Sequence, residues 1–369
     1  MLKNRINVNI TIFFICLLPF IMVMGNSLFI PLIPHIQATF QLTTVESGWV
    51  LTSFSIPAAL FVLVGGIISD RFGRKTIAIV GLVLIIIGCA ISAVSLFNVN
   101  HVWYWLILGR VLQGIGAGVV SPLALAFVAD LFEGQKRMKA IGGIEVFNGV
   151  GKLVSPVIGG LILYVSWNIS FVIYLFVAMV ALAGIYIAVN KDTKIKKRVS
   201  LKHTVVEILR IGKTNWRWLL PIIYGGGVGM FLLFGYLFYL SYLAEQHSPF
   251  PNEWNGVIVA LPLIALVVCS YMIGQRLKNN TDSYKIMMIV SVFVMITGTL
   301  SLFLQHSFLL TVIAMFIFSA GLGCFLPAAN AALSVVVTDQ MRGTIFFVLL
   351  NDSLFRCGIW TNHIRRLDE

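Results

Sequence analysis

The chain has 369 residues, of which 59% are hydrophobic and 11% charged, and its formal net charge is +12. A soluble domain has roughly 45–50% apolar residues, so this composition excludes an ordinary soluble protein and indicates one that crosses a membrane several times. The basic charge is scattered over short segments between apolar runs. We therefore expect a lipid bilayer with acidic headgroups as its neighbour, and no nucleic acid.

Ten stretches are long and apolar enough to cross a bilayer as helices, which takes about 20 residues each. They are 11–33, 49–68, 77–96, 102–129, 140–164, 168–190, 218–243, 254–274, 284–304 and 307–337. The runs are continuous rather than alternating, which argues against barrel strands. The first run continues past the length of a signal peptide without a cleavage site. The sequence therefore predicts an all-α polytopic membrane protein with about ten transmembrane helices.

Lysine and arginine mark one side of the predicted membrane. They occur in the N-terminal segment and in every second loop, whereas the loops around 35–48, 97–101, 165–167, 244–253 and 305–306 contain none. Because cytoplasmic loops retain basic residues, we predict a multi-pass protein of the plasma membrane with a cytoplasmic N-terminus.

An internal repeat divides the chain. The segment GAGVVSPLALAFVADLFEGQKR (116–137) matches GLGCFLPAANAALSVVVTDQMR (321–342) at a constant offset of 205. This offset makes helix 4 equivalent to helix 10 and predicts two six-helix halves of parallel topology. We assign 1–190 to the first half, 191–217 to a basic cytoplasmic linker, and 218–345 to helices 7–10 of an incomplete second half.

Three motifs follow one another in the first half: GGIISDRFGRKT (65–76), LGRVLQGIGAG (108–118) and GVGKLVSPVIGG (149–160). Together they resemble the loop 2–3, helix 4 and helix 5 signatures of the major facilitator superfamily, in its drug:proton antiporter branch. The resemblance implies a bacterial exporter of the tetracycline, multidrug or siderophore type. It also implies a monomer that uses the proton gradient. The sequence has no nucleotide, metal or nucleophile motif, so we expect no enzyme, cofactor or metal.

The first motif predicts a gate at the cytoplasmic ends of helices 2 to 4. Gly73 provides backbone freedom for a tight loop, Asp70 can pair with Arg74 one turn on, and Asp130 is a second candidate partner of Arg74. The resemblance implies that Asp70 latches against the opposite half. The alternative is a basic loop that only orients the protein. The full set is Gly66, Asp70, Arg71, Gly73, Arg74, Lys75 and Asp130.

Charged residues inside predicted helices are costly and are functional by default. By resemblance Arg110 supports proton transfer, with a structural arginine bonded to carbonyls as the alternative. Glu145 is our candidate proton carrier, or else an interface residue at the cytoplasmic end. Lys152 lies two turns further on the same face and is a candidate for substrate selection, or a lysine that reaches a carbonyl or Glu145 through water. Asn26 and Gln113 are further candidates for the substrate cavity.

Small residues repeat at every fourth position of predicted helix 5, and a proline bends the same segment. The motif comprises Gly151, Ser155, Pro156, Gly159 and Gly160. Such a stripe permits close helix packing, and we expect it against helix 8. The resemblance implies that this interface prevents leak in exporters. Packing alone would also explain the glycines.

We predict a proton-coupled secondary transporter that exports a small amphipathic compound by alternating access. The alternatives are a facilitator-type importer or symporter and a truncated remnant that does not transport. The segment 346–369 has no glycine-rich spanning run. Codon degeneracy allows its DNA to be written so that a shifted frame gives an apolar sequence that resembles helix 11. We therefore expect a non-native, frameshifted tail, with a genuine ten-helix protein as the alternative.

Overall fold

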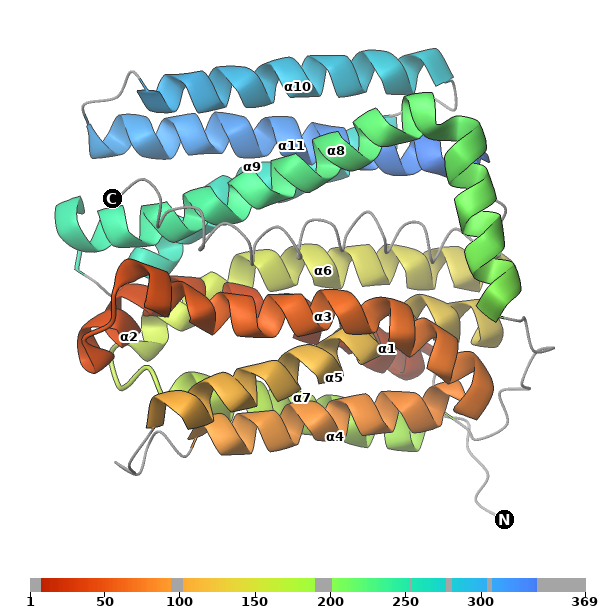
Figure 1. The fold of residues 1–369 in the computed structure, drawn as a ribbon, viewed down its shortest axis with the longest axis horizontal. Coiled ribbons are helices and arrows are strands. Elements are labelled where there is room, and N and C mark those ends of the chain that lie inside the picture. The colour runs from red at the N-terminus through yellow and green to blue at the C-terminus, as the bar shows by residue number, and fades with distance from the viewer. Residues whose placement is uncertain are drawn as a thin grey trace. The chain divides into compact units, whose positions relative to one another are not determined.

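The computed structural model describes residues 8–93, 102–189, 201–251, 254–276, 281–303 and 307–336. In these ranges the regular secondary structure is helical, and ten helices are long and apolar enough to cross a membrane. The expected all-α architecture is confirmed for this part of the chain (Figure 1). The helices are α1 (Val8–Ser27), η1 (Ile30–Leu32), α2 (Ile33–Phe40), α3 (Thr44–Phe72), α4 (Arg74–Ala93), α5 (Val102–Leu131), α6 (Gly134–Ile162), α7 (Ile169–Ala188), α8 (Leu201–His247), α9 (Asn255–Arg276), α10 (Thr281–Phe303) and α11 (Phe308–Val336).

The first spanning segment is interrupted, where the sequence predicted one uninterrupted run over 11–33. It consists of α1, the short η1 and α2, with a turn between α1 and η1. Pro31 and Pro34 lie at the starts of η1 and α2. Proline has no N–H to continue the helical ladder, so the α-helix stops before Pro31 and resumes in α2. This helix ends at Phe40, and Gln41 directly after it has a left-handed conformation (φ 54°).

A capping box begins α3 several residues before the predicted start of that span. The backbone N–H of Thr43 donates to the Glu46 carboxylate at 2.8 Å, and the N–H of Glu46 donates to the Thr43 hydroxyl at 3.2 Å. The two side chains thus satisfy backbone donors that have no partner within the helix. The polar T-x-x-E pattern extends the helix beyond the apolar run that predicted it.

Helix α8 also begins early, at Leu201, inside the segment 191–217 that we interpreted as a linker. The predicted tail, 346–369, lies outside the described residues, as do residues 190–200.

The chain forms two compact units. The first consists of Met1–Ser27, Val50–Lys152 and Asn168–Leu201, and the second of Leu28–Trp49, Leu153–Trp167 and Lys202–Glu369. Helices α3 and α6 each contribute to both units. These units follow packing rather than the linear halves of the sequence, and the domain boundaries proposed above stay predictions.

Packing inside the two units repeats as the sequence does. In the first unit, a Cβ on Gly118 of α5 would collide with the carbonyl oxygen of Ala58 in α3; in the second, a Cβ on Gly323 of α11 would collide with that of Leu266 in α9. The preceding repeat glycines, Gly116 and Gly321, approach α4 and α10 in the same way. Figure 1 shows α4 beside α5 and α10 beside α11. The equivalence of helices 4 and 10 is therefore confirmed in three dimensions.

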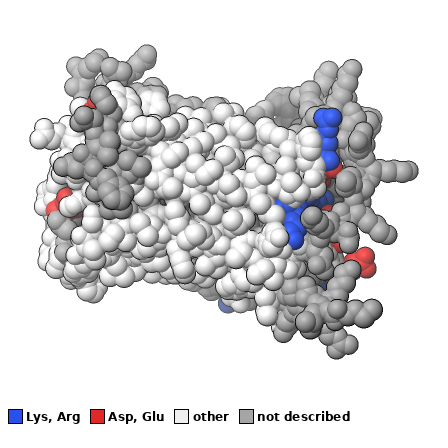
Figure 2. Space-filling model, turned by 90° about the horizontal axis from the view of Figure 1, so that it is seen from below, with Lys and Arg blue, Asp and Glu red and all other residues white. Residues whose placement is uncertain are grey.

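Uncharged side chains cover most of the face drawn in Figure 2, where coloured lysine, arginine, aspartate and glutamate are sparse. Many large apolar side chains of the spanning helices are exposed. Examples are Phe176 and Ile187 of α7, with exposed fractions of 61% and 62%. In a protein that spans a membrane, such side chains face lipid.

Candidate functional site

A single residue, Gly73, separates α3 from α4. Its φ of +93° lies in the region that L-residues with a Cβ rarely adopt. Its N–H donates to the carbonyl of Ser69 at 3.0 Å, and its carbonyl accepts from the N–H of Ile77 at 3.2 Å. The predicted tight turn at Gly73 is confirmed, and it places the side chains on either side of it at the two adjoining helix ends.

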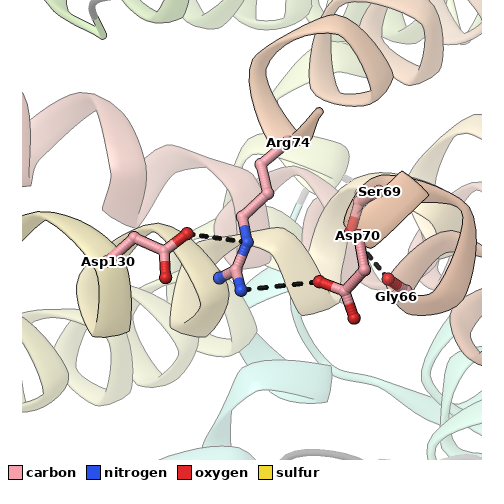
Figure 3. Close-up of polar contacts among 5 residues, drawn as sticks. All are labelled: Gly66, Ser69, Asp70, Arg74 and Asp130. Carbon is pink, nitrogen blue, oxygen red and sulfur yellow. Dashed lines mark hydrogen bonds and ion pairs between the residues drawn. The ribbon is translucent and has the colours of Figure 1, made fainter. Parts of the chain in front are cut away.

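Arg74 lies between two carboxylates (Figure 3). Its Nε is 2.9 Å from Asp130 Oδ2 and its Nη2 is 3.5 Å from Asp70 Oδ1. Both predicted pairings are thus confirmed as contacts. They connect the end of α3, the start of α4 and the end of α5 within one unit.

The two carboxylates differ in environment. The side chain of Asp130 is 12% exposed, whereas that of Asp70 is 64% exposed. Partial desolvation raises the pKa of Asp70, Arg74 lowers it, and the negative charge of Asp130 raises it again. Arg74 therefore holds Asp130 firmly and Asp70 loosely. This arrangement leaves Asp70 the more available for another partner.

The neighbouring residues of the motif have distinct positions. Lys75 donates to the carbonyl of Tyr186 at 2.6 Å and to that of Val189, and its Nζ lies 5.1 Å from the centroid of the Tyr186 ring. It therefore caps the C-terminal end of α7, a role that the sequence did not indicate. Arg71 is exposed, and the Gly66 carbonyl accepts a 2.7 Å hydrogen bond from Ser69 Oγ.

Arg110 is fully buried in α5. Its Nε donates to the carbonyl of Val50 at 2.9 Å, its Nη1 donates to Gln113 Oε1 at 2.9 Å, and its guanidinium lies 4.6 Å from the centroid of the Phe54 ring. Gln113 in turn donates to Ser92 Oγ at 3.2 Å. These contacts fit the structural alternative for Arg110, and its part in proton transfer stays a prediction.

The two polar cavity candidates are both buried in packed contacts. Gln113 is 0% exposed and bonded as above, and Asn26 is 2% exposed, with its Nδ2 donating to Ser55 Oγ at 3.1 Å. Asn26 Oδ1 has no recorded partner among the described residues. The structure places these residues at the junctions of α1 with α3 and of α4 with α5. Contact with substrate stays a prediction for both.

Glu145 and Lys152 lie on either side of the middle of α6, which spans Gly134–Ile162. Glu145 is exposed and Lys152 is half-buried. Their charges attract each other, but neither residue forms an ion pair within the described part of the chain. Asn148 lies between them, and its buried Oδ1 has no recorded partner there.

The orientation of this polar face follows from the rest of α6. Val146, Val150 and Val154 recur at every fourth position and are 55%, 43% and 39% exposed, as expected of a stripe that faces lipid. At 3.6 residues per turn, Glu145 and Lys152 lie about 140° and 160° around the helix from Val150. The charged face therefore points away from the lipid stripe.

The first half of α6 packs against α1. Phe147 makes edge-to-face contacts with Phe13 and Phe20, at centroid distances of 5.5 and 6.4 Å. A Cβ on Gly151 would lie 3.2 Å from the Phe20 ring and 3.3 Å from Val23. Gly151 thus admits a neighbouring helix, but this helix is α1 and not the predicted helix 8.

The second half of α6 contacts α9, as the sequence predicted for helices 5 and 8. A Cβ on Gly256 of α9 would collide with the Pro156 carbonyl oxygen and lie 2.7 Å from the Gly160 nitrogen. Gly159 approaches the Leu28 carbonyl in the same manner, and Ser155 is 0% exposed. The expected packing against helix 8 is therefore found at Pro156 and Gly160, whereas Gly151 and Gly159 of the predicted stripe face the first spanning segment instead. The role of this interface against leak stays a prediction.

Two further polar contacts in this second unit were not foreseen. Ser47 Oγ and Tyr242 Oη are 2.7 Å apart, and Ser241 Oγ donates to the Ile30 carbonyl at 3.0 Å. They connect α8 to the start of α3 and to η1. The two residues of each contact lie about 200 positions apart in the chain, so no local sequence pattern indicates the contact. Among the described residues, no three His, Cys, Asp or Glu side chains converge as metal ligands.

Comparison with known proteins relates this geometry to a family. The sequence profile of the Major Facilitator Superfamily matches residues 15–350. The chain is 29% identical over 329 residues to the bacillibactin exporter of Bacillus subtilis, covering 89% of this chain and 82% of the relative. It is 24% identical to multidrug resistance protein 2 of the same organism, covering 92% and 84%. A solved bacterial homologue of the human lysosomal transporter Spinster superposes with a TM-score of 0.74 at 16% identity, covering 97% and 82%.

Proposed function

The chain belongs to the Major Facilitator Superfamily and is a multi-pass membrane transporter rather than an enzyme, and we propose that it exports a small amphipathic compound in exchange for protons. Relatives named as a bacillibactin exporter and a multidrug resistance protein support the direction of transport. We place it in the bacterial plasma membrane as a monomer with a cytoplasmic N-terminus. This orientation rests on the distribution of basic residues between loops.

The single observation that carries the proposal is the position of Glu145. Among the described residues it is the only carboxylate that lies about three turns or more from both ends of its helix. A charge at such a depth costs at least about 2.5–3.5 kcal/mol, so it marks a functional site by default. Its face of α6 is directed away from lipid, where protons and substrate could reach it.

The proposed cycle follows from the two protonation states of this carboxylate. Facing the outside, Glu145 takes up a proton and becomes neutral, which lowers the free-energy cost of removing its carboxyl group from water when the site closes. Facing the cytoplasm, where the proton concentration is lower, it releases the proton. Rearrangement of the Arg74 ion pairs at the cytoplasmic helix ends would accompany this change of access, and substrate would move outward in exchange.

The test is dye transport by the purified full chain in proteoliposomes with an imposed pH gradient. We expect the pH gradient to accelerate the movement of an aromatic dye in the direction opposite to that of the protons. Glu145→Gln should abolish this acceleration, because an amide does not take up a proton in this pH range. Glu133→Gln is the matched control, since Glu133 is exposed between α5 and α6. It should transport as the parent does.

Two results would overturn the proposal. Dye uptake that follows protons in the same direction would establish the importer or symporter alternative. Equal pH dependence of export in Glu145→Gln and the parent would place the proton carrier elsewhere.

A further inference from the structure

Opposite charges at a fixed spacing characterise the polar face of α6. Glu145 and Lys152 are seven residues apart, which places their Cα atoms about 10 Å apart along the helix. Asn148 lies between them with a buried, unpartnered Oδ1. All three lie on the side of α6 that faces away from Val146, Val150 and Val154.

This face is neutral as a whole but has two separate charges. The pair is too far apart for a direct ion pair, so each charge lacks a hydrogen-bonded counter-charge within the described residues. A ligand with a single charge would satisfy one of them and be repelled by the other. A ligand with both charges, separated by several ångströms, would pair with Glu145 and with Lys152 at once. Its binding would break no ion pair between these two residues.

We infer that the Glu145, Asn148 and Lys152 face of α6 binds a zwitterionic substrate, with its cationic group at Glu145 and its anionic group at Lys152. The inference rests on the proposed function and names the substrate class of that same site. Asn148 Oδ1 accepts a hydrogen bond from an N–H or O–H group between the two charges. This gives a function to Lys152, the one charged residue of the GVGKLVSPVIGG motif.

A zwitterion at this site also suits exchange for protons. When Glu145 takes up a proton, its carboxylate loses its charge and the ammonium group of the ligand loses its partner. Proton and substrate therefore compete for Glu145, which is the condition for antiport. An anionic substrate held by Lys152 alone would instead bind more tightly after Glu145 is protonated, and the two would move together.

Binding of three matched fluorescent probes tests the inference. Nα-dansyl-lysine has a carboxylate and an ammonium group, its methyl ester has only the cation, and its Nε-acetyl derivative has only the anion. Each is titrated at pH 7.5 into the full chain in lipid nanodiscs. We expect the zwitterion to bind at least about tenfold more tightly than either singly charged probe, the lower end for a hydrogen bond to a charged group.

The variants separate the two ends of the site. Lys152→Gln should weaken binding of the zwitterion about tenfold without weakening binding of the ester, which Lys152 repels, and Lys152→Arg should restore the preference. Glu145→Gln should weaken binding of the zwitterion and of the ester, and should not weaken binding of the anionic probe. Lys139→Gln is the matched control, because Lys139 is exposed near the start of the same helix and its Nζ contacts Asn9 Oδ1 at 3.3 Å.

Equal affinity for the three probes, no measurable binding of the zwitterion, or an equal loss for all probes in Lys152→Gln would overturn the inference. Its failure is distinguishable from failure of the proposed function. Proton-driven export of dye without a zwitterion preference would refute only the substrate class. A zwitterion preference without proton-driven transport would refute only the antiport.

Discussion

Arg74 holds two carboxylates of unequal environment at the ends of α3 and α5. Its contact with Asp130 is short and both side chains are largely buried, whereas its contact with Asp70 is longer and Asp70 is 64% exposed. A hydrogen bond between charged, largely buried groups contributes about 1.5–3 kcal/mol. An exposed pair at this helical spacing contributes about 0.3–0.5 kcal/mol.

We therefore predict that Asp130→Asn lowers the free energy of unfolding by about 1–2 kcal/mol, and that Asp70→Asn lowers it by less than about 0.5 kcal/mol. Thermal unfolding of the purified chain in one detergent measures both. The effect on transport should be the reverse. Asp70→Asn should lose most of its transport although the variant is inserted in the membrane and stable. Normal flux in Asp70→Asn would return this loop to the simpler role of orienting the protein.

Local chemistry made part of this site predictable. The turn at Gly73, the pairing of Asp70 with Arg74 and the polar face of α6 depend on residues within two helical turns of each other. Spacing alone therefore indicates them. The contacts of Arg110 with Val50, of Lys75 with Tyr186 and of Tyr242 with Ser47 could not be predicted, because in each pair the two residues come from helices distant in the chain.

At the scale of helices, the internal repeat defines where pairs of helices approach most closely. Gly118 and Gly323 occupy equivalent positions in the repeat. Gly118 faces a backbone carbonyl of α3, and Gly323 faces a backbone carbonyl of α9. Apolar periodicity predicted the helices themselves. Their precise ends differed where Pro31, Pro34 and the Thr43 capping box act, since these are polar or backbone effects that hydropathy does not register.

We predict that Gly118→Ala and Gly323→Ala each destabilise the protein by about 1–3 kcal/mol, because the added methyl group forces two packed helices apart. Helix propensity alone would predict a gain of about 1 kcal/mol. Gly274→Ala is the control, since a Cβ at Gly274 of α9 meets no atom within 4 Å. Thermal unfolding of the three variants checks this, and equal behaviour of all three would contradict close approach at the repeat glycines.

At the scale of the whole molecule, the proposed cycle places the Arg74 ion pairs on the cytoplasmic side, and this depends on which side of the membrane each loop occupies. The two ends of α6 provide the sharpest comparison. The end near Lys136 is basic, whereas the other end, near Tyr164, has no lysine or arginine close by. Basic loops are retained in the cytoplasm, so Lys136 should be inside and Tyr164 outside.

Labelling of single cysteines with a membrane-impermeant maleimide tests this orientation in intact cells, in a background where the five native cysteines are replaced by serine. Lys136 is exposed and Tyr164 is 62% exposed, so either position should react wherever the reagent can reach it. We expect Tyr164→Cys to react in intact cells and Lys136→Cys to react only after permeabilisation. The opposite pattern would place the N-terminus and the Arg74 ion pairs outside, and would overturn the proposed orientation. Reaction of both positions in intact cells would mean that α6 does not span the membrane, and the argument for its polar face would fail with it.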